Sequence, residues 1–155
     1  MKLYLVQHAE AKSKEEDPER PLSDRGWAET RTVAAYVAEH GDIEVDQIYH
    51  SGKARARQTA EALAAALHPA KGIDQADDLA PLAEAAVWAA RLADMTDDVM
   101  LVGHLPHLSK LAGLLLCQDE DNSVVAFQMG GIVCLSQAQS DDWSVRWMVT
   151  PEIVG

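Results

Sequence analysis

Short apolar runs alternate along the chain with longer segments whose apolar residues recur at helical spacing. The runs of strand length are 3–6, 45–49, 99–102, 131–136 and 143–149, with a weaker one inside 73–79. The helical segments are 27–40, 53–67, 82–92 and 106–116. This alternation predicts an α/β fold. We expect a three-layer αβα sandwich with a mostly parallel central sheet and a C-terminal antiparallel hairpin at one edge.

Residues at the helix ends suit caps, and the apolar stripes predict the core. Ser23 or Asp24 can cap the helix at 27–40, and Gly41 ends it as a residue free to take positive φ often does. Pro106 falls in a first turn, where a missing N–H does no harm. The side chains expected to face inward are Ala28, Val33, Ala34, Val37 and Ala38 on one helix, Val87, Trp88 and Leu92 on another, and also Trp27, Trp143 and Trp147.

Length and composition bound the class of protein. With 155 residues, 48% hydrophobic and 25% charged, we expect one soluble domain over 1–155. No apolar run reaches the length of a membrane span and no signal peptide is recognisable, so we expect a cytoplasmic protein without membrane contact. Cys117 and Cys134 lack metal-ligand spacing and are expected to be buried free thiols.

The formal net charge is −12. This charge argues against nucleic acid as a partner, because a phosphate backbone needs a basic footprint. An anionic substrate would be bound by a few focused cations against an unfavourable overall field. Arginines near a candidate site are therefore informative.

Two histidines follow two of the buried apolar runs. His8 comes after the run at 3–6, and His104 comes after the run at 99–102. Open α/β sheets bind ligands outside the carboxyl ends of their strands. One histidine there can simply begin a loop, but two that reach the same edge form a candidate site.

Three cations, Lys53, Arg55 and Arg57, lie at the start of the predicted helix at 53–67. Helix starts favour acidic residues, because the helix dipole is positive there. Solvated surface positions account for Lys53 and Arg57. We predict that Arg55 binds an anion.

Four motifs follow one another along the chain. They are Gln7-His8-Ala9, Arg20-Pro21-Leu22-Ser23, Ser51 to Ala60, and Val102-Gly103-His104. Together they resemble the histidine phosphatase superfamily, in particular its short SixA-type phosphohistidine phosphatases. The family's tail is matched by Phe127, Gly130, Trp143 and Pro151-Glu152. The resemblance covers nearly the whole chain and implies a phosphoglycerate mutase-like fold.

The resemblance implies a role for each matching residue. His8 would be the nucleophile, forming a phosphohistidine intermediate that water hydrolyses. Arg55 and His104 would hold the phosphoryl oxygens and stabilise the transition state. No metal or other cofactor is expected. The expected partners are phosphate ion and a phosphorylated protein, such as a histidine phosphotransfer domain, or a small phosphorylated substrate.

The first motif departs from the family pattern, because Gln7 stands in place of arginine and Ala9 in place of glycine. Gln7 can donate only neutral hydrogen bonds to a phosphoryl group. Losing a charge-assisted bond costs roughly 1.5–3 kcal/mol, or about ten- to a hundredfold in rate. Arg20 is the candidate substitute cation, because the resemblance places its loop over the pocket. The alternative is that Arg20 is a surface charge of the loop.

A recognisable general acid is also missing. Asp77, Asp78 and Glu84 lie in the middle region where larger family members supply one, but we interpret each as a surface charge. Phosphohistidine needs little protonation help, since its imidazole leaving group has a reference pKa of about 6.5. This favours phosphohistidine over a sugar phosphate as substrate.

Three hypotheses follow. The first is a phosphohistidine phosphatase, the second a phosphate-binding protein that lost turnover through Gln7, and the third a small-molecule phosphomonoesterase of the same fold. The remaining histidines have no comparable support, and His107 is interpreted as a helix-surface or packing residue. These histidines are His40, His50, His68 and His107.

Overall fold

A computed structural model describes residues 1–41 and 43–155 of the protein. Within them, six strands form one sheet in the order β3-β2-β4-β1-β5-β6. Strands β1 to β4 are parallel, whereas β5 runs antiparallel to β1 and β6 antiparallel to β5. The strands are β1 (Lys2–Gln7), β2 (Gln47–His50), β3 (Ile73–Gln75), β4 (Val99–Gly103), β5 (Ile132–Gln137) and β6 (Trp143–Val149).

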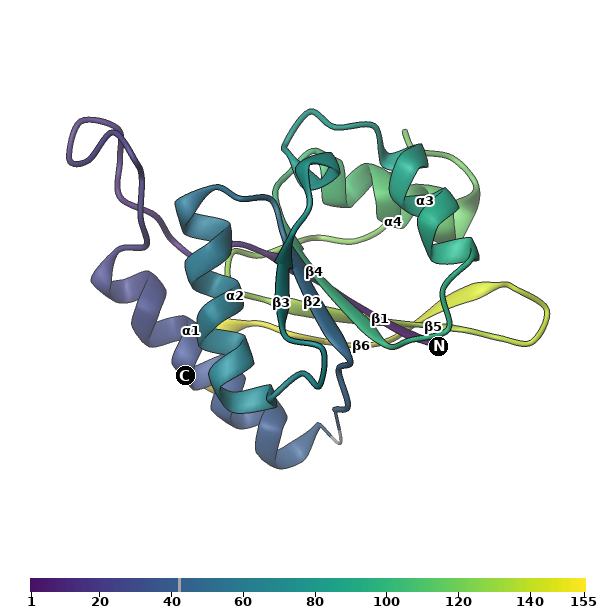
Figure 1. The fold of residues 1–155 in the computed structure, drawn as a ribbon, viewed down its shortest axis with the longest axis horizontal. Helices are drawn as coiled ribbons and strands as arrows, with labels where there is room; N and C mark the ends of the chain where they lie inside the picture. The colour runs from purple at the N-terminus through teal and green to yellow at the C-terminus, as the bar shows by residue number, and fades with distance from the viewer. Residues whose placement is uncertain (42) are drawn as a thin grey trace.

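Helices cover both faces of this sheet (Figure 1). On one face lie α1 (Asp24–His40) and α2 (Ala54–Leu67), and the short C-terminal α5 (Pro151–Val154) contacts α1. On the other face lie α3 (Ala85–Ala93) and α4 (His107–Cys117). A 3₁₀ turn, η1 (Asp77–Leu79), follows β3. The predicted three-layer α/β fold with an antiparallel hairpin at one edge is confirmed.

The continuous apolar run of β1 is explained by its central place between two cores. Leu3 and Leu5 pack with the residues of α3 and α4, whereas Tyr4 and Val6 pack with those of α1 and α2. Successive side chains of a strand point to opposite faces, so a strand covered on both faces has no polar side. The run therefore marks a central strand.

Several predicted helix ends move by a few residues. Helix α1 begins at Asp24, three residues earlier than expected, and Ser23 caps it by accepting the Gly26 N–H at 3.0 Å. The expectation of a positive φ at Gly41 is wrong, because its φ is −86°. Left-handed residues end two other helices instead, His68 in α2 and Gln118 in α4.

Some side chains expected in the core are exposed. On α1, Ala28 and Ala38 face solvent, and on α3 so does Val87. The buried stripe of α1 starts two residues earlier than predicted because the backbone of Glu10 packs directly on Gly26, where a Cβ would clash with the Glu10 carbonyl oxygen. The buried residues of α1 are Gly26, Thr30, Val33, Ala34 and Val37.

The expectations for tryptophan and cysteine hold in part. Trp88 is fully buried, but the other tryptophans are only half-buried. Trp147 lies on edge strand β6 and packs on Tyr4, with ring centroids 6.0 Å apart. Both cysteines are free, yet only Cys134 is buried and Cys117, the last residue of α4, is exposed. Among the described residues, no helix is long and apolar enough to cross a membrane.

Candidate active site

The two histidines lie at the ends of neighbouring strands. In the pairing of β1 with β4, Gln7 lies opposite Gly103. His8 extends this ladder by one bond, donating its backbone N–H to the Gly103 carbonyl at 3.0 Å. The rings of His8 and His104 are 5.0 Å apart between centroids. The predicted convergence of the two histidines at one sheet edge is therefore present in the structure.

The tautomer of His8 is fixed by its backbone. Its Nδ1 lies 2.8 Å from the carbonyl oxygen of Ala9, and because a carbonyl can only accept, Nδ1 must carry the proton. In the neutral ring, Nε2 then has the free lone pair. Burial lowers the pKa of His8, the Ala9 contact raises it, and the charges of Arg55 and Arg20 lower it further. The net direction is downward, so the ring is neutral at neutral pH.

His104 contacts a serine that the sequence motif contains but to which we assigned no role. Its Nε2 lies 2.6 Å from the hydroxyl oxygen of Ser51, the residue that follows β2. Burial and the neighbouring charges of His8, Arg55 and Lys53 lower the pKa of His104 to about 3. Its Nδ1 is buried without a hydrogen-bond partner among the described residues. His104 is thus a neutral imidazole beside His8.

Arg55 lies in the first turn of α2, where it was predicted to bind an anion. Its Nε is buried and has no hydrogen-bond partner within residues 1–41 and 43–155. Thr59 ties this turn to the segment that contains His8, because its hydroxyl donates to the Arg55 carbonyl at 2.8 Å and accepts the Ala9 N–H at 3.1 Å. Burial and the charge of Arg20 lower the pKa of Arg55.

Arg20 reaches the same region from the loop before α1. It takes a left-handed φ of 49° and donates from Nε to the Lys12 carbonyl at 3.1 Å. The loop is held to α2, because Gln58 accepts the Leu22 N–H at 2.7 Å. Arg20 and Arg55 line a common cleft, and the charge of Arg20 lowers the pKa of both His8 and Arg55. Gln7 ends β1 one residue before His8, and its carbonyl accepts the Gly130 N–H at 2.9 Å.

Three polar residues of the site were quoted within a motif but given no role: Ser51, Gln58 and Thr59. Each lies in the segment from Ser51 to Ala60, and each forms a hydrogen bond to a residue at least 36 positions away. For Gln58 and Thr59, the available signal was a polar side chain near Arg55 in an otherwise alanine-rich helix, whereas Ser51 precedes that helix. Their partners cannot be inferred without the fold.

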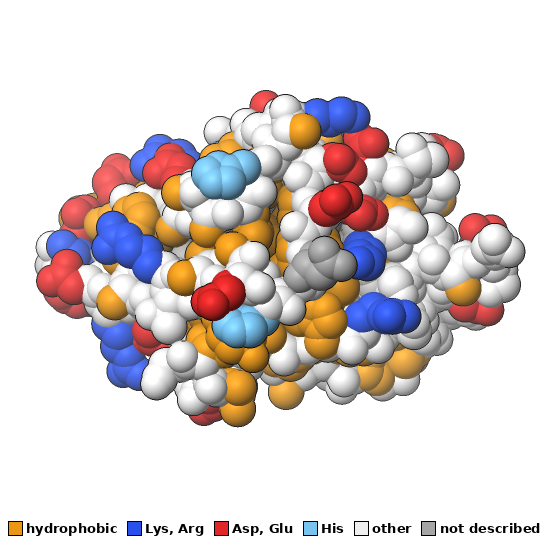
Figure 2. Space-filling view, turned by 90° about the horizontal axis from the view of Figure 1, so that it is seen from below, with side chains coloured by type: hydrophobic (Ala, Val, Ile, Leu, Met, Phe, Trp, Pro, Cys, Tyr) orange, Lys and Arg blue, Asp and Glu red, His pale blue; other side chains and the backbone are white. Residues whose placement is uncertain are grey.

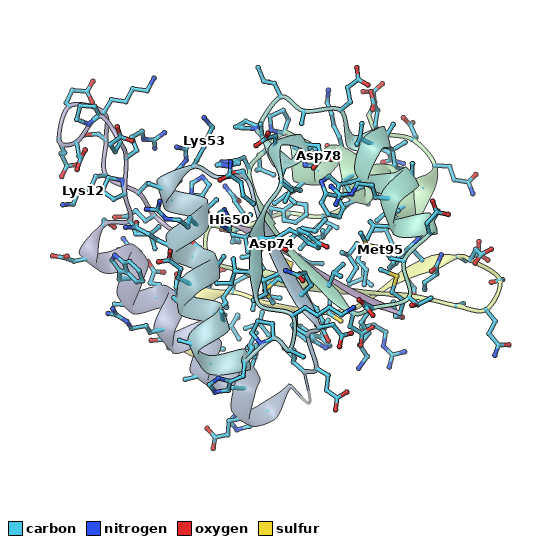
Figure 3. The ribbon with its side chains drawn as sticks, viewed as in Figure 1. Lys12, His50, Lys53, Asp74, Asp78 and Met95 are labelled. Carbon is cyan, nitrogen blue, oxygen red and sulfur yellow. The ribbon has the colours of Figure 1, made fainter. Side chains whose placement is uncertain are left out.

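The carboxylates of the middle region do not reach the two histidines by any described hydrogen bond. Asp77 and Glu84 are exposed, as expected. Asp78 is half-buried, so its interpretation as a surface charge is wrong. It accepts a hydrogen bond from Trp88 Nε1 at 2.7 Å and pairs with Arg91 at 3.0 Å, which gives it a structural role (Figure 3). Within the described residues, no group of three or more histidine, cysteine or acidic side chains could hold a metal ion.

His107 is a buried packing residue rather than a helix-surface residue. It is 0% exposed, and neither ring nitrogen has a hydrogen-bond partner among the described residues. Burial lowers its pKa, and Asp78 raises it by a smaller amount. The other histidines without an assigned role are separate from this core: His40 and His68 are exposed, and His50 accepts the Gly52 N–H.

Replacing His107 with leucine should stabilise the protein by about 1–3 kcal/mol at pH 7, because an apolar side chain of similar volume removes two unpaired polar atoms from the core. The difference in stability between the variant and the unmodified protein should increase below pH 6.5. There the unfolded His107 takes up a proton that the folded one resists, so the unmodified protein loses stability relative to the variant, by up to about 1.4 kcal/mol per pH unit. Urea unfolding at pH 7.5 and 5.5 measures both effects.

Exposed His40, replaced in the same way, is the control and should show neither effect. If His107→Leu instead destabilises the protein at both pH values, the ring nitrogens have partners in solution and the interpretation is wrong.

Comparison with known proteins agrees with this geometry. The profile of the histidine phosphatase superfamily (branch 1) matches residues 3–83. The chain is 24% identical over 156 residues to phosphohistidine phosphatase SixA of Escherichia coli (strain K12), covering 97% of this chain and 94% of that protein. It is 38% identical over 120 residues to an uncharacterised protein of Picosynechococcus sp., covering 72% and 71%. A solved structure of the protein histidine phosphatase SixA complexed with tungstate superposes with a TM-score of 0.87, at 21% identity and full coverage of both chains.

The fold, the paired histidines and the profile match define the class. The chain belongs to the histidine phosphatase superfamily. Within that superfamily, it resembles SixA over nearly the full length of both chains.

Proposed function

We propose that the chain is a phosphohistidine phosphatase that works through a covalent phosphohistidine on His8. One observation carries the proposal: the contact of Nδ1 with the Ala9 carbonyl leaves the Nε2 lone pair of a neutral ring free. A nucleophilic imidazole needs this state. The family membership of the chain and its likeness to SixA support the same activity.

In the first step, Nε2 of His8 attacks phosphorus and forms an N–P bond. The bond from phosphorus to the substrate's imidazole breaks, and the electron pair goes to the leaving nitrogen. A substrate ring protonated at its other nitrogen leaves as neutral imidazole, whose conjugate acid has a reference pKa of about 6.5. In the second step, water attacks the phosphorus of phospho-His8, which releases inorganic phosphate and restores the free ring.

The cations compensate the charge of the phosphoryl group. Arg55 offers its unpartnered Nε, and Arg20 supplies a second positive charge close to His8. Phosphoryl transfer is catalysed mainly by such positioning and charge stabilisation. We assign His104 to the phosphoryl oxygens as well, and Ser51 to its orientation through the 2.6 Å contact. With these roles filled by side chains, we propose a metal-independent reaction.

The proposed substrate is a phosphohistidine-bearing protein in the cytoplasm, such as a histidine phosphotransfer domain. Asp78 is engaged by Trp88 and Arg91, so it is poorly placed to protonate an alkoxide leaving group. This favours a substrate whose leaving group is already good over a phosphate monoester.

The test compares three substrates with the unmodified protein: a phosphohistidine peptide, a phosphoserine peptide and a small sugar phosphate. We expect rapid release of phosphate from the first and slow or no release from the others. Faster hydrolysis of the sugar phosphate would identify a small-molecule phosphomonoesterase instead. Binding of inorganic phosphate without turnover of any substrate would identify a binding protein.

Arg20 should supply the positive charge that is missing at position 7, where Gln7 stands in place of the family's arginine. We expect Arg20→Ala to lower kcat/KM for the phosphohistidine peptide by about ten- to a hundredfold, since one charge-assisted contact is lost. Adding Gln7→Arg should then recover most of that loss, whereas in the unmodified background it should change the rate little. The four proteins form a double-mutant cycle that isolates the coupling.

Arg25→Ala is the matched control, because Arg25 is an exposed arginine of the same region that pairs with Glu29 at 2.8 Å. It should leave kcat/KM unchanged. A large gain in kcat/KM from Gln7→Arg alone, with no loss from Arg20→Ala, would contradict the prediction. It would show that the site lacks a second cation and that Arg20 does not provide one.

A further inference from the structure

A cleft of about 380 Å³ opens beside the two arginines, between the loop at 14–20 and the start of α2. Its charged lining residues are Lys14, Glu19, Arg20, Lys53 and Arg55. Four cations thus face one acidic side chain. In a chain with 13 basic and 25 acidic residues, this is a local reversal of the overall charge.

None of the four cations pairs with a carboxylate of the described residues. Within residues 1–41 and 43–155, the cations that form ion pairs are Arg25, Arg57, Lys71 and Arg91, and all four lie outside the cleft. Elsewhere charges are mixed: on the underside of the molecule, acidic and basic side chains are interspersed (Figure 2). Unpaired cations gathered in one concave place favour an anion there.

The backbone holds the cleft open in this shape. Gly52 takes a φ of 90° in the turn from β2 into α2, a conformation that suits glycine. Lys53 then stands at the end of α2 nearest the loop that carries Lys12 (Figure 3). The opposite wall is the loop that Gln58 fastens to α2. Arg20 and Arg55 belong both to this cleft and to the surroundings of His8.

We infer that the cleft binds a second anionic group of the substrate, next to the phosphoryl group at His8, with Lys14 and Lys53 as its specificity-determining residues. The inference rests on the proposed function for the position of the first phosphoryl group. The ligand chemistry is an oxyanion, either the carboxylate of an acidic residue beside the phosphohistidine or a second phosphate on the same molecule. Lys53, expected to be only a solvated charge, thereby gains a role.

Anion binding tests this without turnover. Pyrophosphate and orthophosphate are titrated into the unmodified protein and into the double variant Lys14→Gln/Lys53→Gln, and the ratio of their dissociation constants is compared. We expect the preference for pyrophosphate to fall by about tenfold in the variant, the effect of two exposed ion pairs, while orthophosphate binding changes little. An unchanged ratio would overturn the inference.

The control is the double variant Lys110→Gln/Arg146→Gln, which removes the same charge outside the cleft and should keep the native ratio. If the control lowers the ratio equally, the effect is one of net charge and the inference fails. Because these readouts need no hydrolysis, they stand even if the proposed phosphatase activity is not found.

A second experiment identifies which molecule provides the anionic group that the cleft binds. Phosphohistidine peptides with aspartate or asparagine beside the phosphorylated residue are compared by KM in both proteins. A lower KM for the aspartate peptide that disappears in Lys14→Gln/Lys53→Gln assigns the cleft to an acidic segment of a protein. Equal KM values, together with the lost pyrophosphate preference, assign it to a second phosphate of a small substrate.

Discussion

Replacing His8 with alanine should abolish hydrolysis of a phosphohistidine peptide, with a loss of roughly a thousandfold or more in kcat. In the proposed mechanism, the ring supplies the attacking lone pair at Nε2, and the described residues offer no second neutral imidazole as well oriented. His104 is the nearest ring, but its Nε2 is engaged by the Ser51 hydroxyl. Phosphate release from the peptide, followed over time at pH 7.5, measures the loss.

Rapid quenching during turnover gives the second readout for His8. The unmodified protein should carry an acid-labile, base-stable phosphoryl group, and His8→Ala should carry none. Orthophosphate should still bind to the variant, because Arg55 and Arg20 remain. Turnover that survives in His8→Ala would exclude His8 as the nucleophile. If the variant loses both turnover and phosphate binding, its pocket has collapsed. Circular dichroism and unfolding of both proteins therefore accompany the assay.

The sequence was sufficient to predict that His8 lies at the edge of the sheet. Its strand is apolar at four consecutive positions, which only a strand covered on both faces tolerates, and the structure places these residues in two cores. The run that precedes His104 has the same character. The histidines at their ends therefore had to reach one edge of the sheet. That β1 and β4 are direct neighbours, with the rings 5.0 Å apart, depends on the strand order, which the pattern does not contain.

Thr59 and Ser51 show what the sequence could not provide. Thr59 joins Ala9 to Arg55, across 50 positions of the chain, and Ser51 meets His104 across 53. Hydroxyl groups make many kinds of hydrogen bond, so neither residue type points to its partner. The Thr59 contact joins α2 to the segment after β1, and the Ser51 contact follows from the pairing of β2 with β4. Both are properties of the folded chain.

Small and amphipathic residues explain the errors in the core. Alanine suits either side of a helix, so Ala28 and Ala38 were assigned by spacing alone and are exposed. The close packing of Glu10 on Gly26 sets the true face of α1. From the sequence alone, Arg20 could be either a surface charge of its loop or a cation of the site. In the structure, Arg20 lines the same cleft as Arg55, which is the placement that the second role requires.

Replacing Arg55 with alanine should lower kcat/KM for a phosphohistidine peptide by about a hundred- to a thousandfold, the usual effect of removing one preorganised donor to a developing anion. The helical turn that carries Arg55 is tied to Ala9 through Thr59, which fixes the backbone of Arg55 close to His8. Its buried Nε gains a partner when a phosphoryl group binds. Most of the loss should therefore appear in kcat, with a smaller rise in KM, because the charge develops in the transition state.

Arg57→Ala provides the matched control for Arg55. It removes the same charge two residues along α2, from a half-exposed side chain that pairs with Glu61 at 3.4 Å, and should change kcat/KM by less than about twofold. Arg55→Lys separates charge from shape: a lysine keeps the charge but not the planar fork that can grip two oxygens, so we expect partial recovery only. Equal, small effects of Arg55→Ala and Arg57→Ala would show that Arg55 is a surface charge like its neighbour, and the phosphoryl site would have to be assigned elsewhere along this edge of the sheet.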